Sequence, residues 1–398
     1  MEFDLRPNVT FHDGSPVDAE TVAAALKTAL PQYMGPAFSE ITHIAAASAT
    51  RIEIGFIHPS PLLLEGLEAT IQKPGPIGTG PFVPVGQTAP NEMRANPTYS
   101  FGRPAIDRIV VNPYHNVRSA WADMLRDRID MLYEVGTDAL DSLTSSKTVS
   151  VFTYVRHYQY VLVFNTRSGV LAPKEIRRAL NEAVDRAVFV KEAFDGHAVP
   201  SSGPVWPSNW AVSLDFSGPS YNPRHAASTL AKRKPRLRFT CLVRPGLERV
   251  TLALKRQLEE AGVDVTIEEA PLNSIFQSMG QGTFEAVLME LLSGPNLFRP
   301  YEIWHSKGSA NPGGFGSTQL DVAFDQILST TDDAGYRAAV SGLQAMTIDD
   351  PPGIFLAWPE RARAVSRRFD VAAEPNRDIL TTLRLWRPTN ALEYANRN

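Results

Sequence analysis

The side chains that could do chemistry are spread singly along this sequence of 398 residues. A metal centre needs closely spaced ligands, such as two histidines at i and i+4 or a cluster of carboxylates. The eight histidines include no i,i+4 pair, and none lies near clustered carboxylates. The G-x-S-x-G nucleophile turn, the G-x-x-x-x-G-K-[ST] phosphate loop and the H-E-x-x-H zinc motif are all missing from it. Asp332 and Asp333 are adjacent and point in different directions, so they suit helix capping better than paired acid–base catalysis. We therefore predict a protein that is not an enzyme and that needs no metal and no cofactor.

Two other motifs also favour structural interpretations. GTGPFV (residues 78–83) begins like a dinucleotide-binding loop, but Val83 stands where the third glycine belongs. Cys241 is the single cysteine, which excludes an intramolecular disulfide, and its apolar neighbours in LRFTCLV indicate a buried strand thiol. Neither motif predicts a reactive site.

Composition excludes several classes of partner. The net charge is −4, and the one basic run, KRKPRLRF (residues 232–239), is expected to be a solvated lead-in to a strand, so nucleic acid is not an expected partner. No apolar stretch approaches the roughly 18 to 20 residues of a membrane span, and the N-terminus has no signal-peptide pattern. The 31 prolines and 26 glycines are spread along the chain, which indicates many short elements joined by shaped loops.

The first 82 residues predict a small mixed α and β unit followed by a linker. Alternation over residues 3–5 and 9–11 predicts a half-buried hairpin, and Asp18 is a suitable N-cap for a helix over the next turns. A strand over residues 51–56 and a short helix over 62–69 follow. KPGPIGTGPF (residues 73–82) is too rich in glycine and proline to be regular and reads as a link between lobes.

From Ala105 onward the pattern alternates between strands and helices. Residues 157–166 predict a strong strand ending at Asn165, and residues 172–194 predict one amphipathic helix with Pro173 just inside its start. A β-α-β-α-β unit follows, and it favours a mostly parallel sheet. Its predicted elements are a strand at 237–243, a helix after Gly246 that ends at Gly262, a strand at 263–267, a helix at 272–279 and a strand at 284–291. Two more helices (320–328 and 336–346) precede a last strand at 353–358.

The order of sequence blocks resembles the extracytoplasmic solute-binding proteins of peptide/nickel-type ABC transporters, known as family 5. FDLRPNVTFHDGSPVDAETVAAAL (residues 3–26) looks like the most diagnostic block of that family, and IGTGPF (77–82) matches its G-T-G-P-[YF] block. NPTYSFGRPAIDRIVV (96–111) matches a third block, with Ser100 where tryptophan is usual. LRDRIDM (125–131) and APKEIRRALNEAVDRAVFVKEAFDGHAVP (172–200) match two more.

The resemblance implies an α/β fold of the periplasmic-binding-protein type, with two lobes (type II, cluster C-like) and an extra small α+β domain. It places the extra domain at residues 1–76, the first lobe at 77–167 and 354–398, and the second lobe at 168–353. Relatives carry an export signal and several dozen residues ahead of the position where this sequence opens. We therefore expect an N-terminally truncated first lobe, with an exposed sheet edge near Met1.

The function that the resemblance implies is the capture of a small organic solute or oligopeptide for an ABC importer, without catalysis. Its implied partners are the solute and the permease subunits of the transporter, its implied location is the periplasm or cell surface, and a monomer is expected. The alternative is an intracellular ligand-sensing regulatory domain of the same fold, which the missing signal peptide favours.

A cleft that closes on a solute needs aromatic walls and a few fixed polar groups. The candidates lie in loops and strand ends that face the other lobe, with Trp206 and Trp358 favoured because their loops correspond to cleft-lining segments of the family. The full set is Trp206, Trp358, Tyr158, Tyr160, Arg299, Asn311 and Phe315. Arg299 could hold a carboxylate through two parallel hydrogen bonds.

One position departs from the peptide-binding members of the family. Those members place an aspartate just after the strand that matches FEAVLMEL, where it pairs with the N-terminal ammonium of the peptide. The best-aligned residue in this sequence is Gly294, and Glu290 could substitute only if the alignment slips by four residues. Because an unpaired buried ammonium costs several kcal/mol, the departure argues against free peptides in the usual pose.

Overall fold

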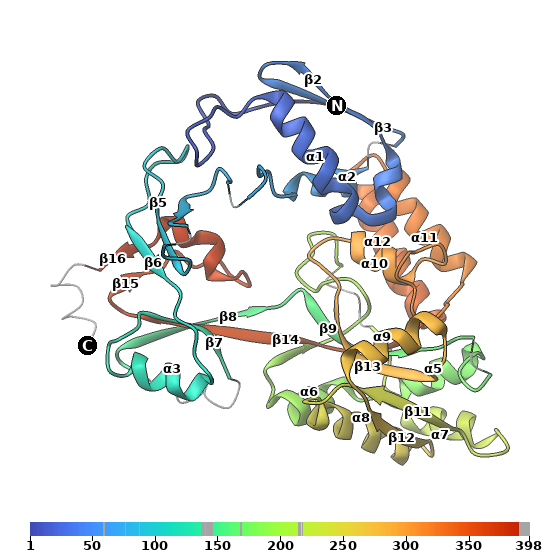
Figure 1. Ribbon diagram of the computed structural model, residues 1–398. Helices are drawn as coiled ribbons and strands as arrows, with labels where there is room; N and C mark the ends of the chain where they lie inside the picture. Colours follow the sequence, from blue (N-terminus) through green and yellow to red (C-terminus); the bar gives the residue numbers. More distant parts are fainter. Residues whose placement is uncertain are drawn as a thin grey trace.

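The computed structural model describes residues 1–389 except 59, 76, 87, 137–139, 141–145, 168, 214–215 and 217. Figure 1 shows three parts: a small domain at the top, a first lobe at the left and a second lobe at the right. The predicted boundaries at residues 76 and 168, and the predicted end of the first lobe at 390–398, lie outside the described residues. No helix in the described part of the chain is both long and apolar enough to cross a membrane.

The small domain is a three-stranded antiparallel sheet, ordered β1-β3-β2, covered by helices. Asp18 caps its first helix as predicted, because its carboxylate accepts the backbone N–H of Thr21. Its elements are β1 (Glu2–Asp4), α1 (Ala19–Met34), the 3₁₀ helix η1 (Gly35–Glu40), β2 (Ile41–Ser48), β3 (Arg51–Phe56), α2 (Pro61–Glu65) and the 3₁₀ helix η2 (Gly66–Glu68).

The predicted hairpin at the start of the chain is wrong. Only β1 is a strand, and it pairs with β3, not with residues 9–11. Asn8 has a φ of 59°, which turns the chain out of the extended conformation, and Thr10 makes a single bridge to Pro16. Phe11 is fully buried beneath the ammonium of Lys73, so its apolar character reflects loop packing and not a strand.

The first lobe consists of short strands and one described helix. β4 (Phe82–Pro84), β5 (Glu92–Ala95) and β6 (Arg108–Val110) form a separate antiparallel sheet. The remaining elements are α3 (Val117–Met124), β7 (Met131–Val135), β8 (Val149–Val155), β15 (Phe369–Asp370), the 3₁₀ helix η3 (Ile379–Leu385) and β16 (Arg387–Pro388).

The second lobe is built on a sheet with the strand order β10-β14-β9-β13-β11-β12. Its strands are β9 (Tyr158–Phe164), β10 (Ala198–Pro200), β11 (Arg238–Val243), β12 (Asp264–Glu269), β13 (Ala286–Leu292) and β14 (Gly353–Ser366). Its helices are α5 (Lys174–Glu182), α6 (Arg186–Phe194), α7 (Pro223–Ala231), α8 (Glu248–Glu260), α9 (Leu272–Gln281), α10 (Phe298–Trp304), α11 (Thr318–Ser329) and α12 (Asp333–Asp349).

The predicted β-α-β-α-β unit is confirmed as β11-α8-β12-α9-β13. β11 lies parallel to both β12 and β13, and Gly262 follows α8 in the left-handed conformation with a φ of 92°. The prediction of a mostly parallel sheet holds for this unit alone. β9, β14 and β10 pair antiparallel, since β14 returns from the end of α12 and β9 enters from the first lobe.

The predicted single helix over 172–194 is two helices, α5 and α6. Asp185 ends the first by capping the second, because its carboxylate accepts the backbone N–H groups of Ala187 and Val188. Pro173 lies at the N-cap position of α5, one residue before the helix begins. The capping prediction for Asp332 is confirmed, since its carboxylate accepts the N–H of Gly335 at the start of α12.

The last predicted strand is longer than expected and joins the two lobes. β14 runs through the arginine-rich segment to Ser366, and pairs first with β9 in the second lobe and then with β8 and β7 in the first. The charged segment ERAR can form a strand because its arginines find partners, as Arg363 does with Asp378. Figure 1 shows β14 and the β8–β9 segment running side by side between the lobes. These two segments connect the lobes in the part of the chain that the structure describes.

Buried polar side chains of α5 and α6 hold the start of β14. Arg177 donates to the carbonyl of Pro351 at 2.9 Å, Asn181 donates to that of Gly353 at 3.0 Å, and Arg186 donates to that of Phe355 at 2.7 Å. β10 pairs with β14 only from Ala357 onward, so no strand covers these three carbonyls on that side. The side chains supply the hydrogen bonds that a neighbouring strand would otherwise supply.

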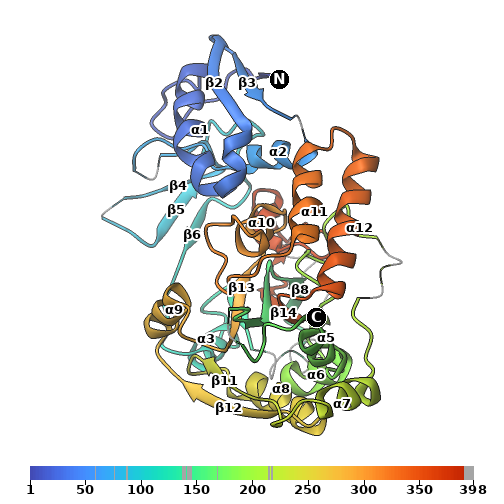
Figure 2. The ribbon, with the colours of Figure 1, turned by 90° about the vertical axis from the view of Figure 1, so that its right-hand side faces the viewer.

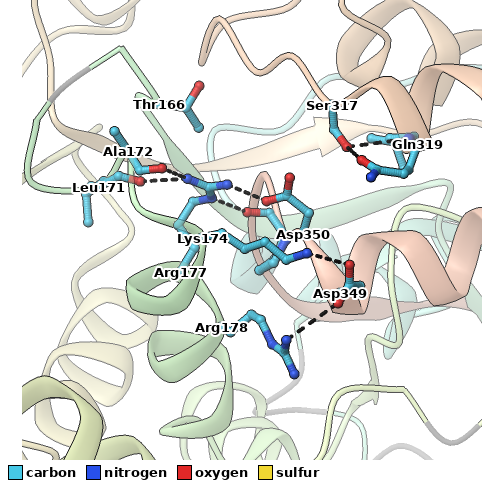
Figure 3. Close-up of polar contacts among 12 residues, drawn as sticks. Thr166, Leu171, Ala172, Lys174, Arg177, Arg178, Ser317, Gln319, Asp349 and Asp350 are labelled. Carbon is cyan, nitrogen blue, oxygen red and sulfur yellow. Dashed lines mark hydrogen bonds and ion pairs between the residues drawn. The ribbon is translucent and has the colours of Figure 1, made fainter.

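Figure 3 shows Arg177 reaching from α5 to the end of α12. Its guanidinium also donates to the carbonyls of Leu171 and Ala172 and pairs with Asp350. Lys174 binds the carboxylate of Asp349 from the solvent side at 2.5 Å. Arg177, Asn181 and Arg186 of the RRALNEAVDR block are therefore structural in this fold, because they anchor the strand that crosses between the lobes.

The small domain shares a hydrophobic core with the second lobe. Buried residues of α1, α2, β2 and β3 form one cluster with residues of α10, α11 and α12. Ser60 lies between them, and its buried hydroxyl donates to the carbonyl of Ile327 at the end of α11, at 2.6 Å. Figure 2 shows α2 beside α11. The small domain is thus packed onto the second lobe as well as joined in sequence to the first.

Candidate functional site

The candidate site lies where β9 enters the second lobe from the first. Alternation along β9 places Gln159 on the face that also carries Val161, and Tyr158 and Tyr160 on the other face, and His157 is the residue directly before the strand. Val161 belongs to the core shared with the small domain and with α10–α12, so this face points toward those elements. We call the group of His157, Gln159, Ser201, Trp206 and Ser293 the crossing face.

A buried hydrogen-bond network fixes the crossing face. The fully buried side chain of Gln159 donates to the hydroxyl of Ser293 at 2.7 Å and accepts from the hydroxyl of Ser201 at 3.2 Å. The carbonyl of His157 accepts the N–H groups of Ser293 at 2.9 Å and Gly294 at 3.1 Å. Because a buried amide is costly unless its groups are paired, this network holds three chain segments in one arrangement.

His157 and Trp206 project from that network. Their rings meet edge to face, with centroids 4.6 Å apart and an interplanar angle of 89°. The indole N–H of Trp206 is buried and has no hydrogen-bond partner in the structure. Burial lowers the pKa of His157, and the charge of Asp378 in the first lobe opposes that effect. The pair therefore presents a neutral imidazole and an unused donor beside the junction of the lobes.

The first lobe contributes a charged pair near the same point. The guanidinium of Arg363 on β14 donates to the carboxylate of Asp378 from Nε at 2.5 Å and lies 4.0 Å from the ring centroid of Tyr133 and 5.2 Å from that of Tyr154. Burial raises the pKa of Asp378, but hydrogen bonds from Arg363 and from the backbone of Leu380 keep it below its usual value. Asp378 is thus a fixed negative charge on the first-lobe side of the junction.

The opposite face of β9 carries a separate ion-pair cluster. Glu290 on β13 lies directly across from Tyr160, accepts from Arg156 at 2.9 Å and is 3.9 Å from Arg361. The guanidinium of Arg156 also covers the ring of Tyr158 at 4.4 Å. Glu290 therefore has two arginine partners, and it lies on the side of the sheet away from His157.

The predicted site residues fall into three groups. Trp206 lies on the crossing face. Tyr158 and Tyr160 lie on the opposite face of β9, and the ring centroids of Tyr160 and Phe194 are 5.1 Å apart. Trp358 is 1% exposed and pairs with Val199 of β10. The contacts of Arg299, Asn311 and Phe315 lie in the segment that follows β13 and near α5. All seven remain predictions as ligand-binding residues.

Those other three have local partners. Arg299 forms an ion pair with Glu302 one turn along α10. Asn311 closes a turn by accepting from the N–H of Phe315 at 3.0 Å and donating to its carbonyl at 2.7 Å. Phe315 is 3% exposed, with the guanidinium of Arg177 5.6 Å from its ring centroid.

Sequence reasoning did not select His157, Gln159, Ser201, Ser293 or Asp378. One signal was available, because a glutamine inside the otherwise aromatic and β-branched strand HYQYVLVF needs buried hydrogen-bond partners. The identity of those partners could not be read from the sequence. They lie 42 and 134 residues away along the chain.

A cavity of about 490 Å³ lies elsewhere, on the second lobe between β11, α9 and the turn before β13. Two of its charged groups, those of Arg167 and Glu285, already serve the fold. Arg167 donates to the side chain of Asn165 and to the carbonyl of Pro312, and Glu285 accepts the backbone N–H of Thr240 at 2.7 Å. Across the residues that the structure describes, no three histidine, cysteine, aspartate or glutamate side chains are grouped so that they could hold a metal ion.

Comparison with protein families gives one match that covers most of the chain. The model described as "Bacterial extracellular solute-binding proteins, family 5 Middle" matches residues 1–312. Among curated proteins, the oligopeptide-binding protein AppA of Bacillus subtilis is 23% identical over 342 residues, which are 78% of this chain and 62% of AppA. The chain thus spans less than two thirds of the length of that relative.

Solved structures agree on the fold. NikZ of Campylobacter jejuni, in complex with Ni(L-His), superposes with a TM-score of 0.78 at 20% identity, covering 97% of this chain and 87% of NikZ. AppA of Bacillus subtilis, in complex with a nonapeptide, superposes with a TM-score of 0.75 at 19% identity, covering 98% and 87%. At these identities the likeness establishes the two-lobed α/β fold and nothing about the ligand.

Proposed function

Because the chain belongs to the bacterial extracellular solute-binding proteins of family 5, we propose that it captures a small organic solute or oligopeptide between its lobes and delivers it to the permease of an ABC importer. In this role it performs no catalysis and acts as a monomer outside the cytoplasm. The observation that carries the proposal is the crossing face. It places a buried but unpaired indole N–H and a neutral imidazole beside the segments that join the two lobes.

The arrangement suits a ligand that both lobes contact. Trp206 offers apolar area and a hydrogen-bond donor, His157 offers a ring nitrogen, and the ion pair of Asp378 with Arg363 lies on the first-lobe side. A ligand that accepts from the indole N–H would pair a group that is otherwise buried without a partner. The network around Gln159 holds these groups in place before the ligand arrives, which lowers the entropic cost of binding.

The chemistry around Gly294 bears on peptides as solutes. Gly294 has a φ of 69° and carries no carboxylate, while Glu290 is paired with arginines on the far side of the strand. Neither residue supplies a free negative charge for a ligand ammonium at this position. We therefore expect a solute whose recognition does not depend on a free N-terminal amine at Gly294, so acetylating the N-terminus of a peptide ligand should weaken binding less than tenfold.

The test is a ligand screen followed by calorimetry. The purified chain is heated in the presence of peptides, sugars, opines and metal chelates, and a bound solute raises the melting temperature by an amount that grows with the logarithm of its concentration. Isothermal titration then measures the affinity of each stabilising compound. A complete screen without a stabilising compound would contradict the proposal.

Two variants connect the solute to the crossing face. Trp206→Ala and His157→Ala should each weaken solute binding at least tenfold while leaving the melting temperature of the free chain within about 3 °C. Tyr158→Ala is the matched control, since Tyr158 lies on β9 but on the face opposite to that of Gln159. Equal losses in Tyr158→Ala and Trp206→Ala would move the proposed site away from the crossing face.

The alternative role as an intracellular ligand-sensing regulator has no observation in its favour beyond the sequence pattern at the N-terminus. The family that matches is described as extracellular. The importer role is therefore the function that we propose.

A further inference from the structure

A cluster of aromatic and acidic side chains lies where the small domain meets the second lobe, apart from the crossing face. Glu65, the last residue of α2, accepts the indole N–H of Trp210 at 3.0 Å. Trp210 is stacked on Tyr336 at the start of α12, with centroids 5.0 Å apart and an interplanar angle of 9°. The three residues come from two domains and three chain segments.

Tyr336 and Trp210 are each held in a fixed position. Tyr336 is fully buried. Arg337 donates to the carbonyl of Trp210 at 2.6 Å and lies 4.9 Å from its ring centroid, which holds the loop against α12. Trp210 is therefore attached to the second lobe, and its hydrogen bond to Glu65 is a contact between domains.

The carboxyl of Glu65 is poorly compensated in this position. One of its oxygens is buried and has no hydrogen-bond partner, and the hydroxyl of Tyr336 is in the same condition. A buried carboxylate with one unpaired oxygen is costly, whereas the protonated carboxyl avoids the cost of burying a charge. The geometry therefore favours the neutral carboxyl in the packed arrangement.

The charges that face Glu65 do not favour its ionised form. On its own segment, Glu68 is acidic and binds the hydroxyl of Tyr33 of α1 at 3.4 Å. On α12, the guanidinium of Arg337 is held over Trp210 by the carbonyl bond. Burial raises the pKa of Glu65 to about 7, the hydrogen bond from Trp210 lowers it in part, and the charge of Glu68 raises it again.

We propose that the contact of Glu65 with Trp210, which is itself stacked on Tyr336, is a proton-sensitive clasp, in which protonation of the Glu65 carboxyl holds the small domain on the second lobe and ionisation releases it. The clasp lies beside the buried bond from Ser60 to Ile327, so its release frees the end of α2. The role of the clasp in controlling solute entry rests on the proposed function. Its role as a contact between domains does not depend on that function.

The sign and size of the effect follow from linkage. Once the clasp opens, Glu65 is exposed to water and its pKa returns toward the ordinary 4.5. Opening is therefore unaffected by pH below about 4.5, becomes more favourable as pH rises toward 7, and levels off above 7. A pKa change from 4.5 to about 7 corresponds to an opening equilibrium on the order of 100-fold more favourable at pH 8.5 than at pH 4.5.

Backbone hydrogen exchange of the full chain, measured without any solute, tests the clasp. Exchange rates of α2 and of the end of α11, corrected for the intrinsic effect of pH, should rise between pH 5 and 8.5 in the native protein. In Glu65→Gln, whose side chain cannot ionise, the corrected rates should stay constant over that range. Rates that rise equally in both proteins would overturn the proposal, and so would native rates that do not change.

Two further variants keep the test decisive if Glu65→Gln folds poorly. Trp210→Phe removes the hydrogen bond that favours the ionised carboxyl, so the rise in exchange should move to higher pH. Glu68→Gln is the matched control on the neighbouring 3₁₀ helix, and should keep the rise but move it to lower pH. A rise that stays at the same pH in both variants would show that Glu65 does not control it. A failed solute screen would leave these measurements unaffected, so the two proposals fail separately.

Discussion

The adjacent arginines of α5 give the sharpest test of the structural account. Arg177 and Arg178 are neighbours in the sequence, yet the side chain of Arg177 is 5% exposed and that of Arg178 is 48% exposed. Replacing Arg177 by alanine leaves the carbonyls of Leu171, Ala172 and Pro351 and the carboxylate of Asp350 without their donor. Breaking a buried charged network of this kind costs about 3–5 kcal/mol.

The same replacement at Arg178 removes one ion pair to Asp349 at 3.5 Å, with both side chains about half exposed. Exposed pairs of this kind contribute about 0–1 kcal/mol. A cost of 3–5 kcal/mol lowers the melting temperature of a unit of 150–250 residues by roughly 10 °C, so Arg177→Ala should show such a drop and Arg178→Ala a drop of at most about 3 °C.

Differential scanning calorimetry of both variants measures this difference. Arg177→Lys should fall between them, because an ammonium keeps the charge but has three donors on one atom, whereas the planar guanidinium spreads five donors over the four acceptors that Arg177 binds. Melting temperatures of Arg177→Ala and Arg178→Ala within 2 °C of each other would refute the reasoning. The start of β14 would then be held by pairing with β9 alone.

Three further predictions concern separate parts of the molecule. Solute binding to the native protein should be constant above the ordinary pKa of histidine and change only at lower pH, because burial lowers the pKa of His157, and His157→Gln should abolish that change; titration calorimetry between pH 4.5 and 8 checks it, and a change in native binding centred above the ordinary pKa would contradict it. Glu65→Gln should raise the free energy of unfolding by about 3 kcal/mol at pH 8.5 and leave it unchanged at pH 4.5, because only the ionised carboxyl is penalised by burial; urea unfolding at the two pH values measures this, and a larger gain at pH 4.5 would reverse the sign. Cys241 is 2% exposed, and burial raises its pKa to about 12, so a thiol reagent should modify it at pH 8 only as fast as the second lobe unfolds; modification within seconds in the absence of urea would contradict its burial.

Local sequence predicted the elements whose causes are local. Asp18 and Asp332 cap helices through contacts within three residues, and the alternation of LRFTCLV follows from packing of one face of the strand in the core of the second lobe. Errors arose where a local pattern had two explanations. The apolar Phe11 was assigned to a strand but packs in a loop, and the continuous periodicity of residues 172–194 concealed the cap at Asp185.

The sequence by itself determined the family, because the matching blocks are contiguous and occur in order along the chain. It also placed Arg177 and Arg186 in one of those blocks, although not the anchoring of β14 by their side chains. Only the tertiary structure decided which face of β9 meets Trp206 and which side chain binds Glu65. Those contacts join residues up to 145 positions apart, and burial acts on such pairs only after the lobes have packed.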